Sequence, residues 1–525
     1  MEKRADIPFQ VPTRWSTDAA ATARTLEYWT TAENVIYESS KATRKWGGTS
    51  RLNSAAISGT PSVMGLFDAW FSGTSGSMTG YPVAHAGTAL YKMDRTGAVP
   101  DGTWDDITGS LTLTSGAFPT YAMLRDNLVM TTWAATPDAP HVWTGTGNAS
   151  ALGGTPPVGR VCCMHANRMW IANTNANPSR LYYSASLNVA DWSSGDTGSF
   201  DIDPDDGDRI IGLASHYKRL FIFKGPYRGS IHMIVGTSPT DATDATESFR
   251  RQLVVRGLPL ASQRSIVPVG NDLWFVTHRG VHSLANTQNF GDHVLGFLTN
   301  DITNYWRDTI NGIRLDQAAG AYYTDRNLVV FSLCETGQSN NTGGLIFHPQ
   351  LGNTISRLTR GAASLATFYS TGGKHLLYAG RYSNGFVDLE DAAARQLAGA
   401  VAYTAKLRTP TLLLAPGDGR FTMREMYLRM RPRGGAVTVN VTRDTNAAQS
   451  LSFTQTAGGS VLDTGVLDAF NLGEVGGFGV PARQFIEGPA RAVMVEISQG
   501  TVGGDLELLE FGLKVEKADD RMESP

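Results

Sequence analysis

Between residues 82 and 379 one pattern recurs: an apolar strand, a short polar turn, and then Leu or Met followed by an apolar or aromatic run. Its occurrences are PVAHAGTALYKM, YAMLRDNLVMTTW, VCCMHANRMWIA, IIGLASHYKRLFIF, SIVPVGNDLWFV, GAYYTDRNLVVF and ATFYSTGGKHLLYA. The residues after the turns, which follow one another at roughly 40 to 55 positions, are Leu90, Leu128, Met169, Leu220, Leu273, Leu328 and Leu376. One twisted four-stranded sheet cannot bury both of its faces, whereas a ring of such sheets can. The repeat therefore predicts an all-β fold with a β-propeller-like region of six or seven blades, and stacked sandwiches are the alternative.

The stretch GNDLWFVTHRGVHSL at 270–284 illustrates the unit. Residues 273–277 predict a strand, HRG a tight turn around Gly280, and 281–284 a returning strand. His278 and His282 stand four apart, a spacing that would place two metal ligands on one face of a helix. Here they flank a turn, and no Glu, Asp or Cys nearby completes a ligand set. We predict no metal site and no cofactor.

Beyond residue 400 apolar and polar residues alternate strictly, which indicates strands with one buried and one solvated face. In DLELLEFGLKV the apolar phase shifts between Leu508 and Leu509, which predicts a β-bulge. We predict a propeller-like domain at 61–400, a β-sandwich-like domain at 401–516 and a polar tail at 517–525. The residues expected inside the sandwich are Met426, Leu428, Met430, Val437, Val439, Val441, Val493, Val495 and Ile497.

The first 60 residues predict a short N-terminal arm that contains a helix. Asp18 is a suitable helix cap, and Ala-rich helix formers follow it. The basic residues of KATRKWGGTSR favour a docking segment rather than a domain. They are Lys41, Arg44, Lys45 and Arg51.

Charged stretches elsewhere offer two more candidate surfaces. DIDPDDGD at 201–208 resembles a calcium loop, but Asp206 stands where such a loop needs glycine and Gly212 where it needs glutamate. A solvated loop between blades, a fortuitous cation site and a functional acidic lining formed by Asp201, Asp203, Asp205, Asp206 and Asp208 all stay open. A second candidate is a basic face for phosphate or an acidic partner, with a solvated charged face as the alternative. Its residues are Arg424, Arg429, Arg431 and Arg433.

Motifs for catalysis and export are missing from the sequence. It contains no G-x-S-x-G elbow, Walker loop, H-E-x-x-H or C-x-x-C, which argues against an enzyme. SSGDTGSF at 193–200 resembles one incomplete Asp box of sialidase-type propellers, a turn that serves folding rather than catalysis.

The N-terminus lacks a signal peptide and no run is apolar enough to span a membrane, so we expect a chain that is not inserted in a membrane. Three cysteines fit free thiols in a reducing cytosol. A net charge of −3 gives no polycation signal for nucleic acid.

Three parts of the chain carry a family resemblance. They are AENVIYESSKATRKWGGTSRLN, then NRMWIANTNANPSRLYYSASLNVADW with NDLWFVTHRGVHSL, and finally REMYLRMRPRGGAVTVNVTRD with RQFIEGPARAVMVEIS. Together they resemble the tail nozzle family (tail tubular protein B, or tail hub) of short-tailed bacteriophages. The resemblance covers most of the chain and is one of pattern, without a catalytic motif.

The resemblance implies a structural virion protein of the tail that is not an enzyme and is assembled in the host cytoplasm. Six copies would form a ring below the portal and adaptor, with tail fibre or needle proteins as further partners. The ring would be a channel for DNA ejection, through which double-stranded DNA passes without specific binding. On this interpretation 201–208 would line the lumen or a gate, and the segment from Lys41 to Arg51 would dock to the adaptor. The alternative is a sugar-binding or glycan-degrading β-propeller of a phage tail.

Overall fold

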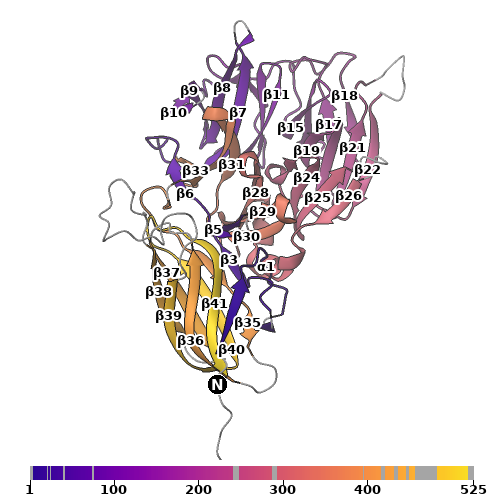
Figure 1. Ribbon diagram of the computed structural model, residues 1–525. Coiled ribbons are helices and arrows are strands. Elements are labelled where there is room, and N and C mark those ends of the chain that lie inside the picture. The colour runs from indigo at the N-terminus through magenta and orange to yellow at the C-terminus, as the bar shows by residue number, and fades with distance from the viewer. Residues whose placement is uncertain are drawn as a thin grey trace, which may run out of the picture.

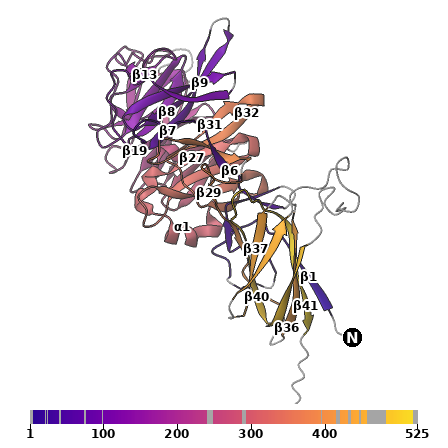
Figure 2. The ribbon, with the colours of Figure 1, turned by 90° about the vertical axis from the view of Figure 1, so that its left-hand side faces the viewer.

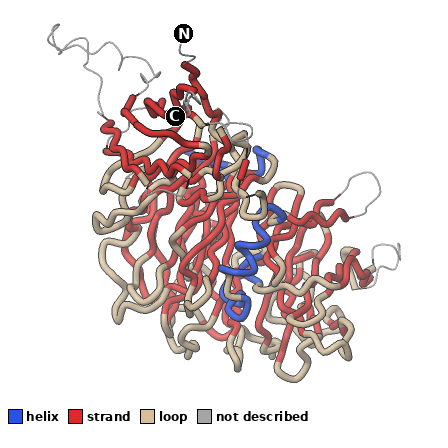
Figure 3. Tube along the Cα trace, turned by 90° about the horizontal axis from the view of Figure 1, so that it is seen from below, coloured by secondary structure: helices blue, strands red, loops and turns tan. Residues whose placement is uncertain are grey.

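The computed structural model describes residues 4–517 except 21, 24, 39–41, 74–75, 98, 240–247, 287–292, 394, 415–419, 431–434, 445–447 and 456–481. The middle of the chain forms a ring of small sheets, and the C-terminal strands form a second body beside it (Figure 1). Figure 3 shows strands almost throughout, with few helical segments. The all-β propeller fold predicted from the repeat is confirmed.

Six separate four-stranded sheets make up most of the ring, and a seventh unit of four strands belongs to a larger sheet. The first two sheets are β7 (Val63–Ser72), β8 (Met78–Ala86), β9 (Ala89–Thr96), β10 (Val99–Asp106), and β11 (Phe118–Leu124), β12 (Asn127–Trp133), β13 (His141–Trp143), β14 (Ser150–Ala151). The next two are β15 (Gly159–His165), β16 (Arg168–Thr174), β17 (Arg180–Tyr183), β18 (Gly198–Asp201), and β19 (Arg209–His216), β20 (Arg219–Gly225), β21 (Ser230–Val235), β22 (Arg250–Arg256). Then follow β23 (Val267–Val269), β24 (Asp272–Thr277), β25 (Gly280–Asn286), β26 (His293–Phe297), and the seventh unit, β27 (Ala319–Tyr323), β28 (Leu328–Cys334), β29 (Asn341–His348), β30 (Thr354–Leu358).

The ring is closed by a strand from the N-terminal segment. The last sheet contains β31 (Ser364–Ser370), β32 (Lys374–Gly380) and β33 (Val387–Ala392), and its outer strand is β6 (Gly48–Arg51). The first strands of neighbouring units contact one another, except that β19 contacts the turn η3 in front of β23, and β31 contacts both β27 and β7. Because β6 and β33 come from opposite ends of the ring-forming chain, their hydrogen bonds hold the first and last units together.

The repeat read from the sequence corresponds to real hairpins. In six of the seven occurrences it joins the first and second strands of a unit, as in β23–β24 and β31–β32. In the first occurrence it joins β8 and β9, the second and third strands, because β7 precedes the repeat. The 270–284 stretch forms the predicted hairpin of β24 and β25, in which Thr277 pairs with Gly280. His282 is buried there, and its Nδ1 lies 3.2 Å from the hydroxyl of Thr277.

The second body consists of two facing sheets. One contains β39 (Ala482–Ala490), β36 (Phe421–Met430), β41 (Glu507–Lys517), β1 (Arg4–Gln10), β5 (Thr43–Lys45) and β4 (Val35–Tyr37). The other contains β2 (Thr22–Ala23), β35 (Thr411–Leu413), β40 (Ala492–Gln499), β34 (Ala405–Arg408), β3 (Thr31–Glu33), β37 (Gly435–Arg443) and β38 (Gln449–Gln455), and it continues into β30–β27 of the ring as one eleven-stranded sheet. The alternating apolar residues of β36, β37 and β40 are all buried, as predicted. The bulge lies at Leu509, because Met430 pairs with Leu508 and Arg429 with Glu510.

The N-terminal segment departs from the prediction. The described residues directly after Asp18 form no helix: β2 lies there and pairs in parallel with β35. Asp18 does cap a helix, but a distant one, since its carboxylate accepts backbone N–H bonds from Thr303 (2.8 Å) and Asn304 (2.9 Å) at the start of α1 (Thr303–Thr309). The capping chemistry was correct and the helix assigned to it was wrong, because a cap need not adjoin its helix in sequence. The strands of 4–51 belong to the sheets of both bodies, whereas the domain boundaries themselves stay a prediction.

One hydrophobic core joins the two bodies. It runs from Trp274 of β24 through Phe347 of β29 to Phe511 of β41, and Trp29 stacks on Phe511 at 5.9 Å between ring centroids. Figure 2 shows the two bodies in line, with strands of the N-terminal segment at their junction. Short 3₁₀ turns complete the described secondary structure: η3 (Gln263–Ser265), η4 (Asn300–Ile302), η5 (Gly312–Gln317), η6 (Thr324–Arg326), η7 (Pro349–Leu351) and η8 (Thr371–Gly373). Within the described residues no helix has the length and apolar character to cross a membrane.

Candidate functional site in the axial channel

Three cavities lie where the first strands of the units converge. The inner cavity, of about 260 Å³, is lined by 64–67 of β7, 119–121 of β11, Gln263, Arg264, Ile266, Ala319, Ser364 and Leu365. The mouth cavity, of about 450 Å³, is lined by residues that include Phe118, Arg314, Asp316, Gln317, Asn340 and Tyr382. A third cavity, of about 20 Å³, shares Arg264 with the inner cavity and Asp316 with the mouth cavity. The three together form the axial channel.

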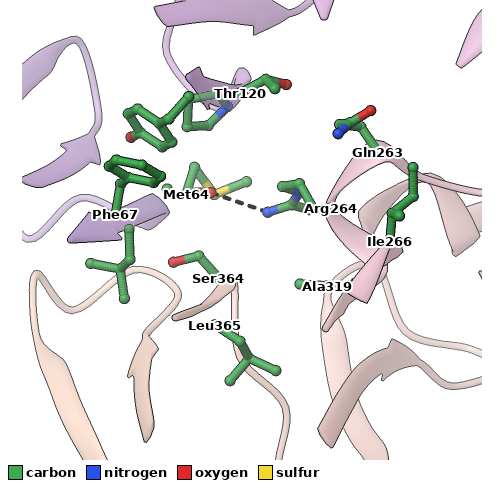
Figure 4. A pocket seen from close by; sticks show the side chains of 13 residues that line it. Met64, Phe67, Thr120, Gln263, Arg264, Ile266, Ala319, Ser364 and Leu365 are labelled. Carbon is green, nitrogen blue, oxygen red and sulfur yellow. Dashed lines mark hydrogen bonds between the residues drawn. The ribbon is translucent and has the colours of Figure 1, made fainter. Parts of the chain in front are cut away.

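Arg264 occupies the centre of this channel (Figure 4). Its residue type suits the position because a guanidinium donates in several directions at once. It donates to the carbonyl oxygens of Met64 at 3.1 Å, Ala363 at 2.6 Å and Gln317 at 2.8 Å, which belong to three other units or their connections. Its guanidinium carbon also lies 4.1 Å from the ring centroid of Phe118 on β11. One side chain thus connects five of the seven units around the axis.

Burial dominates the electrostatics of the channel. It lowers the pKa of Arg264 to about 10, and it raises the pKa of Tyr121 on β11. Asp316 lies on the mouth side of Arg264, and burial raises the pKa of its carboxyl group. Among the described residues, Arg264 Nε and the Tyr121 hydroxyl are buried without a hydrogen-bond partner. The channel therefore contains a half-buried cation whose Nε lacks a hydrogen-bond partner among the described residues.

The mouth cavity gathers side chains that can hydrogen-bond a polar ligand. Arg314, Asp316 and Asn340 carry planar polar groups, and Tyr382 adds a hydroxyl that donates to Gln317 Oε1 at 3.4 Å. Among the lining residues of the three axial cavities, Asp316 is the one carboxylate. Hydrolysis of a glycosidic bond by a pair of carboxylates would need a second one facing it. The described cavity can thus bind a polyhydroxylated ligand, but its lining does not assemble that pair.

The acidic stretch 201–208 connects β18, the outer strand of the third unit, to β19, the first strand of the fourth, and its charges are largely compensated. Asp201 pairs with Arg180, Asp203 with Arg251 at 2.7 Å, and Asp206 with the buried ammonium of Lys224 at 2.7 Å. Asp208 is buried and accepts backbone N–H bonds from Tyr227, Arg228 and Gly229. Asp205 is exposed. Most carboxylates of this stretch are therefore paired and do not form a free acidic lining. Its position in a lumen stays a prediction.

The predicted adaptor-docking residues differ in exposure: Lys45 is buried, Arg44 is half-buried and Arg51 is exposed, and their docking role stays a prediction. Lys45 is fully buried, and its ammonium donates to Gln499 Oε1 at 2.6 Å and Gly504 O at 3.1 Å. Arg44 faces Asp505 at 4.0 Å with a side chain that is 17% exposed, and Arg51 stacks on Phe386 at 3.6 Å. Lys41 lies outside the described residues. Lys45 cannot contact an adaptor, because β5 is an interior strand; removal of this segment would break two sheets.

Two residues of the predicted basic face form ion pairs with a neighbouring strand, and the role of this face as a binding surface stays a prediction. Arg424 pairs with Glu516 at 2.9 Å and Arg429 with Glu510 at 3.3 Å, both across to β41. These cross-strand pairs make a ladder of alternating charge on the sheet rather than a positive surface. Arg431 and Arg433 lie outside the described residues.

The Asp-box-like stretch stabilises a turn. It forms the turn between β17 and β18, where Asp196 accepts from Arg168 at 2.7 Å and from the backbone N–H of Ser186 at 2.9 Å. No group of three or more His, Cys, Asp or Glu residues in the described part of the chain could hold a metal ion.

Sequence reasoning missed Arg264, Tyr121 and Asp316. One signal was available: Arg160 and Arg264 stand at the same offset before Met169 and Leu273, Arg160 in β15 and Arg264 in the turn η3 just before β23. Arg160 is also buried, and it also donates to backbone carbonyls, including Ala134 O at 3.0 Å. A charged residue that repeats at one position of an apolar unit indicates a structural role in the interior.

Comparison with known proteins gives no family. No family model matches the chain, and neither does any curated protein. Among solved structures, the extracellular domain of a one-component system from B. thetaiotaomicron is 10% identical with a TM-score of 0.42 over 76% of this chain, which spans 44% of that one. An exo-β-1,3-galactanase from Phanerochaete chrysosporium, solved with galactose, is 10% identical with a TM-score of 0.29 over 90% and 100% of the two chains. A glycoside hydrolase is 8% identical with a TM-score of 0.24 over 86% and 99%. Likenesses at this level assign no activity to this chain.

One expectation changes nevertheless. The missing motifs and the family resemblance led us to expect that the chain is not an enzyme. This is corrected by the carbohydrate-active enzymes among the similar structures, so the fold offers no ground for excluding catalysis.

Proposed function

We propose that the chain is a structural protein of a short-tailed phage tail, in which six copies form a nozzle below the portal and adaptor. The family resemblance of three stretches supports this proposal. The observation that carries it is the continuous joint between the two bodies, where one eleven-stranded sheet runs from the ring into the second body. A wall that guides DNA out of a capsid requires stiff subunits, since a hinged subunit would let the wall open.

The N-terminal segment reinforces this joint at separate points. Arg14 forms a two-pronged ion pair with Asp301, with Nε at 2.7 Å and a terminal nitrogen at 2.5 Å. Asn34 donates to the hydroxyl of Thr359 at 2.6 Å and to the carbonyl of Thr404 at 2.7 Å, so it ties the ring to the second body. Paired and bidentate contacts of this kind fix orientation as well as distance.

The axial channel also limits where DNA could pass. Arg264 fills its centre, and the cavities on either side hold only small molecules. A DNA lumen would therefore lie between copies of the chain and not along the axis of one propeller. A net charge of −3 supports sliding rather than binding, because retention of DNA needs Lys and Arg that neutralise phosphates.

The test is assembly of the purified full chain with and without the adaptor of its phage. Light scattering after size exclusion, followed by electron microscopy, should reveal a ring of six copies with a central opening when the adaptor is present. A chain that stays monomeric with its adaptor, or a ring without an opening, would contradict the proposal. Fibre or needle proteins should then bind the completed ring and not the free chain.

The mouth cavity favours a second candidate, a propeller that binds a glycan. Arg314, Asp316, Asn340 and Tyr382 supply convergent hydrogen-bonding groups in a cavity of about 450 Å³, a volume suited to one or two sugar rings. Phe118 adds an aromatic surface. Sugar hydroxyls pair with planar polar side chains of this kind.

A glycan array followed by calorimetry tests this candidate. Asp316→Asn should weaken binding of any glycan that the full chain selects by about tenfold or more, since a charged hydrogen bond is lost. Asp308→Asn, at an exposed site on α1, is the matched control. The same samples should be assayed for release of reducing sugars. Glycan binding that is equal in Asp316→Asn and in the unchanged chain would rule out this cavity.

A further inference from the structure

We propose that a neutral glycan binds at the outer strands of the third unit, on the side that faces the second unit, with a sugar ring against Tyr182 and Trp192. This site, the outer groove, is the cavity lined by these two residues together with Asn177 and Ser199. The proposal goes beyond both candidate functions, because neither the nozzle nor a glycan in the mouth cavity uses the outer strands of the ring. It rests on the shape of the groove, on its uncharged lining and on two aromatic side chains with fixed positions.

The outer groove lies where one face of the third unit is left partly uncovered. Ile171, Tyr182 and Ser199 stand opposite one another on β16, β17 and β18, so their side chains share that face. Ile171 is fully buried against the second unit, Tyr182 is half-buried and Ser199 is exposed. The outer strands of the second unit, β13 and β14, have only three and two residues, which explains why burial falls toward this edge. The resulting cavity has about 470 Å³, within the range of small-molecule sites.

The residues that line the outer groove are polar without being charged. Besides the aromatic rings they offer the amide of Asn177 and the hydroxyls of three threonines and Ser199. Arg180 interacts with Tyr182 but is not a lining residue, and its guanidinium donates to Asp201 at 2.6 and 2.9 Å. A charged ligand would therefore lose water without gaining an opposite charge in the groove, which is costly. Sugar hydroxyls can instead exchange hydrogen bonds with the amide and the hydroxyls.

The two aromatic side chains are held in position within the structure. The indole N–H of Trp192 donates to Val189 O at 2.8 Å, and the hydroxyl of Tyr182 accepts from Asn177 Nδ2 at 3.3 Å. Both side chains are half-buried, so part of each stays accessible to a ligand. The faces of aromatic rings are electron-rich and attract the C–H groups on the flat side of a sugar. Side chains that are already fixed lose little conformational entropy when a ligand binds.

The Asp-box-like stretch supplies one wall of the outer groove. Residues 197–199 line it, and the turn before them is held by the hydrogen bonds of Asp196. A side chain at Gly198 would be excluded, because a Cβ atom would lie 2.3 Å from the Tyr183 hydroxyl. The stretch thus shapes the groove while contributing no catalytic group.

The full chain is tested on an array of neutral, sulfated and sialylated glycans, and the neutral oligosaccharide that binds most strongly is then titrated by calorimetry. We expect saturable binding of at least one neutral glycan, without preference for its sulfated or sialylated form. Tyr182→Ala should weaken this binding by about tenfold or more, because a ring face is lost. Asn177→Ala should weaken it by about threefold to tenfold, because a hydrogen bond is lost. Tyr227→Ala, at a tyrosine of the fourth unit that is 79% exposed and does not line the groove, is the matched control.

The same titrations separate the outer groove from the mouth cavity. Glycan binding that is lost in Asp316→Asn and kept in Tyr182→Ala would assign the ligand to the mouth cavity and overturn the proposal. If Tyr182→Ala does not fold, Asn177→Ala still decides the question, and equal affinity of this variant and the unchanged chain would overturn the proposal. It is also overturned if no neutral glycan binds, or if only sulfated or sialylated glycans do. Assembly of the ring with its adaptor is measured separately, so failure of the nozzle leaves these outcomes unchanged.

Discussion

Lys45 provides a direct test of how the N-terminal segment is built into the molecule. Its ammonium is fully buried in β5, donates to Gln499 and Gly504, and lies 4.1 Å from the ring centroid of Tyr403. Burial lowers the pKa of Lys45 to about 8, against an opposing effect of Asp505. An unfolded lysine titrates near its ordinary value, about 10.4. Between these values the unfolded chain binds more protons than the folded chain, so the free energy of unfolding must rise with pH.

The magnitude follows from this pKa difference. One unit corresponds to about 1.4 kcal/mol, so the full effect over the whole interval is about 3 kcal/mol. Between pH 7.5 and 9.5 linkage gives a gain of about 2 kcal/mol, since part of the titration lies outside that window. Lys45→Met has nearly the same shape and does not titrate. It removes the cost of burying a charge but leaves two acceptors unpaired, at about 1–3 kcal/mol each, so its stability at pH 7.5 should be close to that of the unchanged chain.

The assay is urea unfolding of the full chain and of Lys45→Met at pH 7.5 and 9.5, with free energies from the midpoints and slopes. Other titrating groups contribute equally to both proteins and cancel in the difference. We expect the unchanged chain to gain about 2 kcal/mol relative to Lys45→Met over this range. A difference that does not change with pH would refute a buried, charged Lys45. It would also refute the interior position of β5.

Three further predictions concern the Asp18 cap of α1, the buried His85 and the turn at Gly280. Asp18→Ala should cost about 1 kcal/mol in urea unfolding through loss of the α1 cap, whereas Asp308→Ala on the exposed side of α1 should cost less than about 0.5 kcal/mol. Burial lowers the pKa of His85 to about 4, so its contribution to stability is full above pH 6.5 and is lost as pH falls toward 4. As pH is lowered from 7 to 4.5, the midpoint temperature of thermal unfolding should therefore fall less steeply in His85→Gln than in the unchanged chain. Equal slopes of midpoint against pH would contradict this. Gly280→Ala should lower the urea midpoint of unfolding more than Gly270→Ala does. At Gly280 φ is +146° and a Cβ atom would lie 2.1 Å from the Thr299 hydroxyl, whereas a Cβ atom at Gly270 would have no neighbour within 4 Å.

The propeller could be predicted from the sequence because its signal is local. Each hairpin places its apolar strands and its turn within about 14 consecutive residues, and the period of the repeat sets the size of the unit. The first unit was placed one strand too late for the same reason. Its inner strand β7 reads VMGLFDAWFS and is joined to β8 by a longer connection, so the short-turn pattern first appears at β8 and β9.

The N-terminal segment could not be predicted because its partners are distant in sequence. β1 pairs with β41, and β6 pairs with β33, at the other end of the chain or of the ring. In addition, β3 to β6 have only three or four residues each, and a sequence pattern of that length does not distinguish a strand from a loop. Ala-rich composition favours a helix by intrinsic propensity, which is a weak preference that tertiary pairing overrides. The four basic residues suggested a docking surface because charged side chains are usually exposed. Lys45 is an exception, since its buried ammonium donates hydrogen bonds to Gln499 and Gly504.

The axial site depends on convergence that no single stretch encodes. The three carbonyls around Arg264 come from residues 64, 317 and 363, and only closure of the ring brings them together. Arg264 therefore has two consequences: it holds the units, and it leaves a positive charge at the axis. A substitution of Arg264 changes both together, so a loss of stability in that variant says nothing about a ligand.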